Sequence, residues 1–303
     1  MESIILYYQS IMSRTLTIVP CCGLANRMRA IAGAYVMATM SDRKLEILWP
    51  ITRDLAAPIE VLLDTRSLRA DWRDITSRQL TMHYKSPGPG NMYLSAVTRS
   101  FGAKIRGRYY LNPDRRAGRR ASYADFEVIE HDIREKAMSP DISHLVITTA
   151  QEIGYVPPEI FRSIFRPSAL VRELVDGKEG LIGPALYRIG VHVRRTDNKD
   201  AIRLSPLRDI MAVVKSEIKR ADRPSMIYLA TDDEKVKKKF SREFPNVITS
   251  AQPATRSTVS GMLEATAEMW MLSRCNIIIG SAASAFNVMA SRIGDRPLIT
   301  VER

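Results

Sequence analysis

The chain has 303 residues, of which 45% are hydrophobic and 26% charged, so it can build one or two ordinary buried cores. A formal net charge of +12 predicts attraction to anionic partners such as phosphorylated ligands, nucleic acid or anionic lipid headgroups. Three cysteines make no disulfide framework, and no CxxC pair suggests a zinc site. No segment has the ~18 consecutive apolar residues of a membrane span. We therefore expect a cytoplasmic protein and leave peripheral contact with a membrane open.

The first half of the chain predicts an α/β domain. Strands are predicted at 15–20, 44–50 and 144–150 from apolar, β-branched runs. Apolar side chains recur every three or four positions over 28–39, which predicts a helix after the first strand. Residues 65–140 are polar and basic with glycine and proline, so we expect short elements and mobile loops there.

The second half alternates strands and helices. Prolines at both ends of 157–167 indicate a connection between domains, so the expected domains are 1–156 and 157–303. Helices are predicted around 168–177, 205–220, 233–241, 258–274 and 284–293, and strands at 187–193, 225–231, 246–250, 275–281 and 297–301. The predicted fold class is α/β, with two Rossmann-like, doubly wound domains that face a cleft. Ligands of such sheets bind outside the carboxyl ends of the strands.

The strand at 187–193 ends in strong hydrogen-bonding groups. Alternation along the strand places His192 and Arg194 on one face and Arg195 on the other. A guanidinium offers a planar fork of donors that suits phosphate, and His192 can bond a ligand through either ring nitrogen. We expect Arg195 and Asp197 to pair behind the site. The alternative is a surface cluster of ion pairs that caps the strand.

Two aspartates follow the predicted strand at 225–231. Asp232 and Asp233 are suited to hold a metal ion that binds a nucleotide-sugar diphosphate. They are equally suited to bind a ligand directly or to fix Arg194 or Arg195. The alternative is that Asp232 only caps the following helix.

Two strand-to-helix turns are candidate anion sites. In "GLANR", Gly23, Asn26 and Arg27 begin a helix whose backbone N–H groups favour an anion, and a cation in the first turn is unfavourable to the helix dipole. In "GSAAS" (280–284), Ser281 or Ser284 can cap a helix or donate to phosphate. The alternatives are an ordinary helix start and simple close packing. Glu268 lies on the preceding helix, where the alternative is plain solvent exposure.

Taken in order, these motifs resemble a fucosyltransferase superfamily that includes α1,6-fucosyltransferases, the nodulation fucosyltransferase and protein O-fucosyltransferases. "GVHVRRTD" (190–197) is similar to the donor-binding motif of the α1,6 enzymes. "YLATDD" (228–233), "LSRCNIIIGSAASAF" (272–286) and "GLANRMRAIAGAY" (23–35) resemble further family motifs. The resemblance implies a GT-B architecture, and a GDP-fucose donor used without a metal or a bound cofactor.

The resemblance also implies roles for single residues. Arg194 would hold the β-phosphate, His192 would contact the nucleotide, and Ser284 would contact a phosphate. Glu268 would read the edge of the guanine base, and Asp232 and Asp233 would form the family's acidic pair.

The sequence departs from the family beside this motif. Asn198 replaces a lysine, and Ile202 stands where the family carries a glutamate that acts on the acceptor. The candidates for the catalytic base are therefore Asp200, Asp197 and Asp233.

We thus expect an inverting glycosyltransferase that moves fucose from GDP-fucose to a glycan, or to a lipid-linked or protein-linked acceptor. The alternatives are a metal-dependent glycosyltransferase with another nucleotide sugar, and a non-catalytic protein that binds a nucleotide sugar or a glycan. Nucleic acid is disfavoured as a partner because the sequence contains no recognised binding motif.

Overall fold

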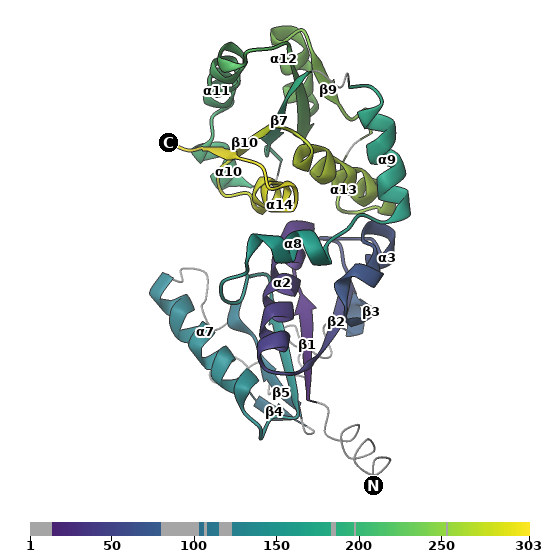
Figure 1. Cartoon of the computed structure of the whole chain (residues 1–303), viewed down its shortest axis with the longest axis vertical. Coiled ribbons are helices and arrows are strands. Elements are labelled where there is room, and N and C mark those ends of the chain that lie inside the picture. The colour runs from purple at the N-terminus through teal and green to yellow at the C-terminus, as the bar shows by residue number, and fades with distance from the viewer. Residues whose placement is uncertain are drawn as a thin grey trace. The chain divides into compact units, whose positions relative to one another are not determined.

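A computed structural model describes the chain except for residues 1–13, 80–102, 106–107, 115–122, 183–185, 197 and 253. The chain forms two compact units (Figure 1). The first contains Met1–Thr52 and Leu68–Pro157, and the second contains Arg53–Ser67 and Pro158–Arg303. A single boundary between residues 156 and 157 therefore does not describe the division, because Arg53–Ser67 groups with the second unit.

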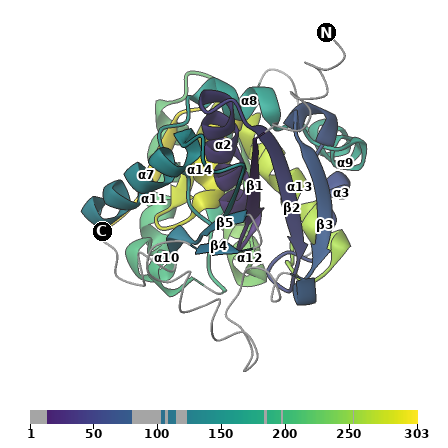
Figure 2. The same ribbon diagram turned by 90° about the horizontal axis from the view of Figure 1, so that it is seen from below.

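The first unit is built on a six-stranded sheet of order β3-β2-β1-β6-β5-β4. Its strands are β1 (Thr15–Pro20), β2 (Lys44–Ile51), β3 (Asp71–Thr76), β4 (Ala103–Ile105), β5 (Arg108–Leu111) and β6 (His144–Thr149). All neighbours are parallel except β4 and β5, which pair antiparallel. Strands β1, β2 and β3 lie side by side in Figure 2. Helix α2 (Leu24–Met40) packs on this sheet.

Helix α7 (Tyr123–Met138) contradicts the expectation of only short elements between residues 65 and 140. Its buried side chains Ile129, Ile133 and Ala137 are four residues apart and form one narrow stripe. The surrounding charged residues mask this stripe in the sequence. Short pieces do fill part of the same region, namely the 3₁₀ turn Thr65–Leu68 and strands β3, β4 and β5.

The second unit is built on a five-stranded, all-parallel sheet of order β11-β10-β7-β8-β9. The strands are β7 (Tyr187–Val193), β8 (Ser225–Thr231), β9 (Val247–Thr249), β10 (Ile277–Ser281) and β11 (Leu298–Val301). The helices are α3 (Ile59–Leu62), α8 (Pro158–Ile164), α9 (Ala169–Glu179), α10 (Lys199–Leu204), α11 (Leu207–Arg220), α12 (Glu234–Glu243), α13 (Val259–Ser273) and α14 (Ala285–Gly294).

The two faces of this sheet have different partners. Val191 and Val193 of β7 point into a core with α11 and α12, to which Val214 and Phe240 contribute. The residues that alternate with them point to the other face, which α13 and α14 cover. Gly190, for example, lies against the side chains of α13 and the turn that follows it. His192 and Arg194 therefore share the face covered by α13 and α14.

Apolar side chains explain why two segments belong to the second unit. Ile59 and Leu62 of α3 are buried, and α3 packs on α9 and α13. Residues 157–167 are more than the expected connection, because α8 begins at Pro158 and buries Phe161 and Ile164. Proline is well suited to a first helical position because its missing N–H has no partner there in any case.

Candidate active site

The strand order of the second sheet defines a switch point between β7 and β10. From β7 the chain continues to β8 and β9 on one side and later to β10 and β11 on the other. Ligands of open α/β sheets bind outside the carboxyl ends of the strands at such a point. Arg194 follows β7, Asp232 follows β8, and Ser281 ends β10. These three predicted site residues therefore lie together at the carboxyl ends of the strands.

Arg194 is held at this edge by its backbone and by its side chain. Its backbone N–H donates to Ser281 Oγ over 3.2 Å, which ties the end of β7 to the end of β10. Its guanidinium Nε lies 3.3 Å from Asp232 Oδ2, and the Arg194 side chain keeps 18% of its surface exposed. The arrangement fixes a cationic fork and leaves part of it accessible to a ligand.

Asp232 organises the loop after β7. It accepts hydrogen bonds from the backbone N–H of Arg195 at 2.8 Å and from Thr196 Oγ1 at 2.7 Å. The alternative that Asp232 only caps the following helix is wrong, because the cap of α12 is Asp233, which accepts from Lys235 N–H at 2.7 Å. The two aspartates thus have different roles: Asp232 holds the loop after β7, and Asp233 caps α12.

Arg195 points away from Arg194, as strand alternation predicts. Its Nη2 donates to the carbonyl of Ser205 over 2.7 Å, and burial lowers the pKa of its guanidinium. The predicted partner Asp197 lies outside the described residues. Arg195 therefore fixes the chain between β7 and α11, and this contact gives it a supporting position behind Arg194.

His192 is buried beside the candidate site, with 4% of its surface exposed. Its ring stacks on Phe286 at a centroid distance of 4.8 Å. Burial, and then the charge of Arg194, lower the pKa of His192 to about 4, so the imidazole is neutral near pH 7. Sequence reasoning missed Phe286, although it stands two residues after Ser284 as the one aromatic side chain of that motif.

Several buried polar atoms on this face have no hydrogen-bond partner among the described residues. They are His192 Nδ1, Tyr228 OH, Glu268 Oε1 and Asn287 Oδ1, and Thr249 Oγ1 on the opposite face is the fifth such side-chain atom. Buried polar atoms almost always have partners, so a group of orphans calls for an explanation. A polar ligand or ordered water on this face would satisfy such atoms.

Glu268 is buried rather than solvent-exposed, with 3% of its surface accessible. Burial, and then the neighbouring Glu264 carboxylate, raise the pKa of Glu268 to about 8. Burial and Glu268 also raise the pKa of Tyr228. Glu268 therefore tends to hold a proton at neutral pH when no ligand is present.

The loop from β10 to α14 presents one accessible hydroxyl. Ser281 is 1% exposed and donates within the fold to the carbonyl of His192 over 3.4 Å. Ser284 begins α14, is partly exposed, and makes no side-chain capping bond. Only glycine fits at position 280, because a Cβ there would lie 2.1 Å from Asn287 Nδ2. Gly280 thus allows the start of α14 to pack closely against the end of β10. Ser284 is thus the better placed of the two serines to donate to a ligand.

Two neighbouring loops are tied together beside Arg194. The side-chain amide of Asn198 donates to the carbonyl of Ala283 over 2.8 Å, and its oxygen caps α10 by accepting from Ala201 N–H at 3.0 Å. Ala283 adopts a left-handed backbone with φ of 53°. Asp200 lies in the first turn of α10 with 71% of its side chain exposed, 3.5 Å from Arg203. Of the three candidate bases, Asp200 is exposed, Asp233 is engaged as a cap, and Asp197 lies outside the described residues.

The turn before α2 in the first unit, which begins with Gly23, is held in place by buried contacts of Arg27. Arg27 is 1% exposed, and its guanidinium donates to the carbonyls of Cys22 at 2.8 Å and Pro50 at 2.5 Å. It also lies 4.7 Å over the Trp49 ring. This buried guanidinium therefore braces β2 against the turn, and the candidate anion site at Gly23, Asn26 and Arg27 stays a prediction. Gly23 caps α2 with ordinary negative φ, and Asn26 is half-buried in its first turn.

The described part of the chain contains no group of side chains that forms a candidate metal centre. No group of three or more His, Cys, Asp or Glu side chains is placed there to hold a metal ion. None of the helices in the described ranges combines the length and the apolar composition of a membrane span. Basic residues are dense at 115–120, which lies outside the described residues, and at 235–242, which lies within α12. In α12, Lys238 and Arg242 are exposed and Lys237 is buried.

A search of protein-family models gives no match to this chain, and a search of curated proteins gives none either. Solved structures do resemble it. NodZ alpha-1,6-fucosyltransferase soaked with GDP-fucose aligns with a TM-score of 0.61 and 19% identity over 93% of this chain and 92% of that one. The fucosyltransferase NodZ from Bradyrhizobium gives 0.60 and 18% over 92% of both chains.

Two further likenesses point to the same architecture. A variant of Arabidopsis thaliana FUT1 in complex with GDP gives a TM-score of 0.60 and 17% identity, covering 96% of this chain and 70% of that one. POFUT1 in complex with GDP-fucose gives 0.55 and 11%, covering 96% and 98%. The chain therefore has the fold of these fucosyltransferases, a GT-B-like α/β fold with two Rossmann-like units.

Proposed function

We propose that this chain is a glycosyltransferase that moves fucose from GDP-fucose to a glycan or glycoconjugate acceptor with inversion at the anomeric carbon. The observation that carries the proposal is the fixed, partly exposed Arg194 at the switch point, beside a face of unpartnered buried polar atoms. A fold shared with enzymes solved with GDP-fucose or GDP supports the same donor. The second unit is the proposed donor-binding part, and the first is the proposed acceptor-side part.

The diphosphate end of the donor is the part that Arg194 suits best. Sugar transfer leaves negative charge on the departing phosphate, and a fixed guanidinium stabilises that charge as it develops. Asp232 orients the guanidinium through Nε, and a planar guanidinium suits phosphate oxygens. The Ser284 hydroxyl at the start of α14 adds a donor without losing a capping bond.

The base end of the donor is the part that Glu268 suits best. Guanine offers N–H donors on neighbouring ring and exocyclic nitrogens, and a carboxylate has the acceptors to match them. Glu268 Oε1 is buried and has no partner among the described residues. Neutral His192, stacked on Phe286, supplies a further ring nitrogen, Nδ1, for the nucleotide.

The acceptor hydroxyl needs a base as it attacks. Asp200 has the most exposed carboxylate of the described candidates and is fixed through the Asn198 cap of its helix. Asp233 would have to leave its capping bond with Lys235. We therefore place Asp200 first, with Asp197 and Asp233 as alternatives.

Two other functions compete. A metal-dependent transferase would need Asp232 and Asp233 as ligands, but Asp232 already receives three donors from the β7 loop and Asp233 caps α12. Activity that survives EDTA would reject that enzyme. A non-catalytic binder would keep donor affinity and release no GDP from the nucleotide sugar.

The test is a thermal-shift panel of GDP, UDP and ADP, followed by GDP-fucose turnover with candidate acceptors. We expect GDP to raise the melting temperature selectively, because only its base offers the paired donors for Glu268. Equal shifts by all three nucleotides, or none with any of them, would reject the proposed donor. Selective GDP binding without GDP release from GDP-fucose would favour the non-catalytic binder.

A further inference from the structure

A buried cluster of charges lies directly behind Glu268. Glu264 is one turn earlier on α13, and its Oε1 lies 2.6 Å from Lys178 Nζ of α9. The Ser250 hydroxyl, just after β9, donates to the same carboxylate. Lys178 keeps only 17% of its side-chain surface exposed and Glu264 6%, so this ion pair is largely removed from water.

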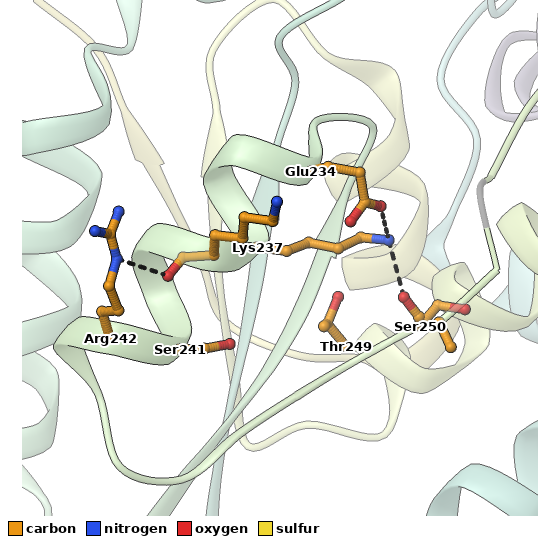
Figure 3. A pocket seen from close by; sticks show the side chains of 8 residues that line it. Glu234, Lys237, Ser241, Arg242, Thr249 and Ser250 are labelled. Carbon is orange, nitrogen blue, oxygen red and sulfur yellow. Dashed lines mark hydrogen bonds and ion pairs between the residues drawn. The ribbon is translucent and has the colours of Figure 1, made fainter.

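A second buried lysine, Lys237 of α12, contacts the same cluster through Ser250. Lys237 extends from α12 to the carbonyl of Ser250, 2.8 Å away, and pairs with Glu234 at 2.6 Å (Figure 3). Thr249, Ser250 and Lys237 together line a depression of about 700 Å³ on the α12 side. Each of the two lysines thus has a carboxylate partner other than Glu268.

Glu268 is therefore the carboxyl group of this cluster that no cation contacts, as far as the described residues go. The groups facing it are Glu264 on its own helix, Lys237 on α12, Lys178 on α9, Asp232 after β8 and Tyr228 in β8. A buried carboxylate without a partner is expensive, so the empty site favours the protonated acid. A ligand that donates hydrogen bonds reverses this preference, because donors stabilise the carboxylate.

Resting on the proposed function, we propose that binding of a nucleobase with paired N–H donors expels one proton from Glu268, and that Glu264 sets how fully Glu268 is protonated beforehand. The base keeps its own hydrogens, and the carboxyl proton leaves to the solvent. Glu264 acts by charge and position without touching the ligand, so it is a positioning residue. Nucleotide affinity must then rise with pH until Glu268 is already ionised in the empty protein.

The direction and range of this dependence follow from the site. With the pKa of Glu268 raised to about 8, the empty site is mostly protonated at pH 6 to 7. Affinity for GDP should increase by close to tenfold per pH unit in that range, because one proton is released per nucleotide bound. The dependence should flatten above pH 8.

Calorimetric titration of the full chain with GDP at pH 7, in two buffers of different ionisation enthalpy, counts the protons released. We expect close to one for the unchanged chain and none for Glu268→Gln. Glu264→Gln should bind GDP and release clearly less than one, because removing the neighbouring charge makes Glu268 ionise more readily. Glu243→Gln, an exposed glutamate of α12 with 41% of its side chain accessible, is the matched control and should release the same number as the unchanged chain.

The outcomes separate this inference from the function beneath it. GDP binding without proton release, at unchanged affinity from pH 6 to 8, overturns the inference and leaves the donor assignment standing. Undiminished release in Glu264→Gln overturns the role of Glu264. Circular dichroism of each variant shows that it is folded before titration. Failure of every nucleotide to bind the folded, unchanged chain overturns the proposed function and this inference together.

Discussion

Substitution of Arg194 by alanine tests the centre of the proposed site. The change should lower turnover of GDP-fucose by at least about 10²-fold, the usual loss when one preorganised donor is removed from a developing negative charge. The reason is that Arg194 is the guanidinium that Asp232 orients at the switch point, with 18% of its side-chain surface still exposed.

The same substitution should leave the fold nearly unchanged. Asp232 keeps its hydrogen bonds from Arg195 N–H, Thr196 N–H and Thr196 Oγ1 after the Arg194 side chain is lost. The backbone bond from Arg194 N–H to Ser281 also stays, because alanine has the same N–H. The Arg194 and Asp232 side chains are only 18% and 12% exposed, so loss of this ion pair should cost about 1–3 kcal/mol. The chain should therefore stay folded while turnover falls.

Three measurements make this comparison: GDP release from GDP-fucose, GDP affinity by calorimetry, and the free energy of unfolding in urea. Arg208→Ala is a matched control, since Arg208 keeps 73% of its side chain exposed and lies 3.3 Å from Asp209. Arg194→Lys should fall between the two, because lysine keeps the charge and loses the planar fork. Turnover of Arg194→Ala within a few-fold of the unchanged chain would refute the reasoning.

Four further expectations concern other residues. Arg27→Ala should destabilise the chain by about 2–4 kcal/mol in urea unfolding because it removes a buried hydrogen-bonded brace, while GDP affinity stays the same. Gly280→Ala should cost about 1–3 kcal/mol by the same measurement, since its Cβ would collide with Asn287. Ser284→Ala should weaken GDP binding about tenfold in calorimetry with little change in melting temperature, as no capping bond is lost. Between pH 6.5 and 8, folded Glu268 holds a proton that the unfolded chain has lost, so stability should fall by about 1 kcal/mol per pH unit as pH rises, and Glu268→Gln should remove that slope.

Much of the second unit could be predicted from sequence because its strands are apolar runs that end in polar groups. β7 and β8 occupy the predicted residues 187–193 and 225–231. Strand alternation also placed Arg194 and Arg195 on opposite faces, as the structure confirms through Asp232 and Ser205. These inferences needed only the two-residue period of a strand.

Other features depend on contacts that a local pattern does not contain. Burial of Arg27 and Glu268 depends on which elements pack around them, since an arginine and a glutamate on helices usually lie at the surface. The choice between Asp232 and Asp233 as the cap of α12 depends on a shift of one residue in where the helix begins. Helix α7 was missed because its buried side chains recur only every fourth residue, without the neighbouring apolar positions that usually mark a helix.

The segment "RRTDNKD" resembles the fucosyltransferase motif as far as Asp197 and departs from it at Asn198. The two parts of the segment are held by different contacts. Up to Thr196 the segment is held by Asp232, a contact that serves the proposed phosphate site. From Asn198 onward it is held by Ala283 of the β10–α14 loop, next to Ser284. The side-chain amide of Asn198 therefore joins the start of α10, which carries Asp200, to the β10–α14 loop at the proposed phosphate site. In the proposed enzyme, acceptor chemistry can then change on α10 while Arg194 keeps its position, because the two halves of the motif have separate anchors.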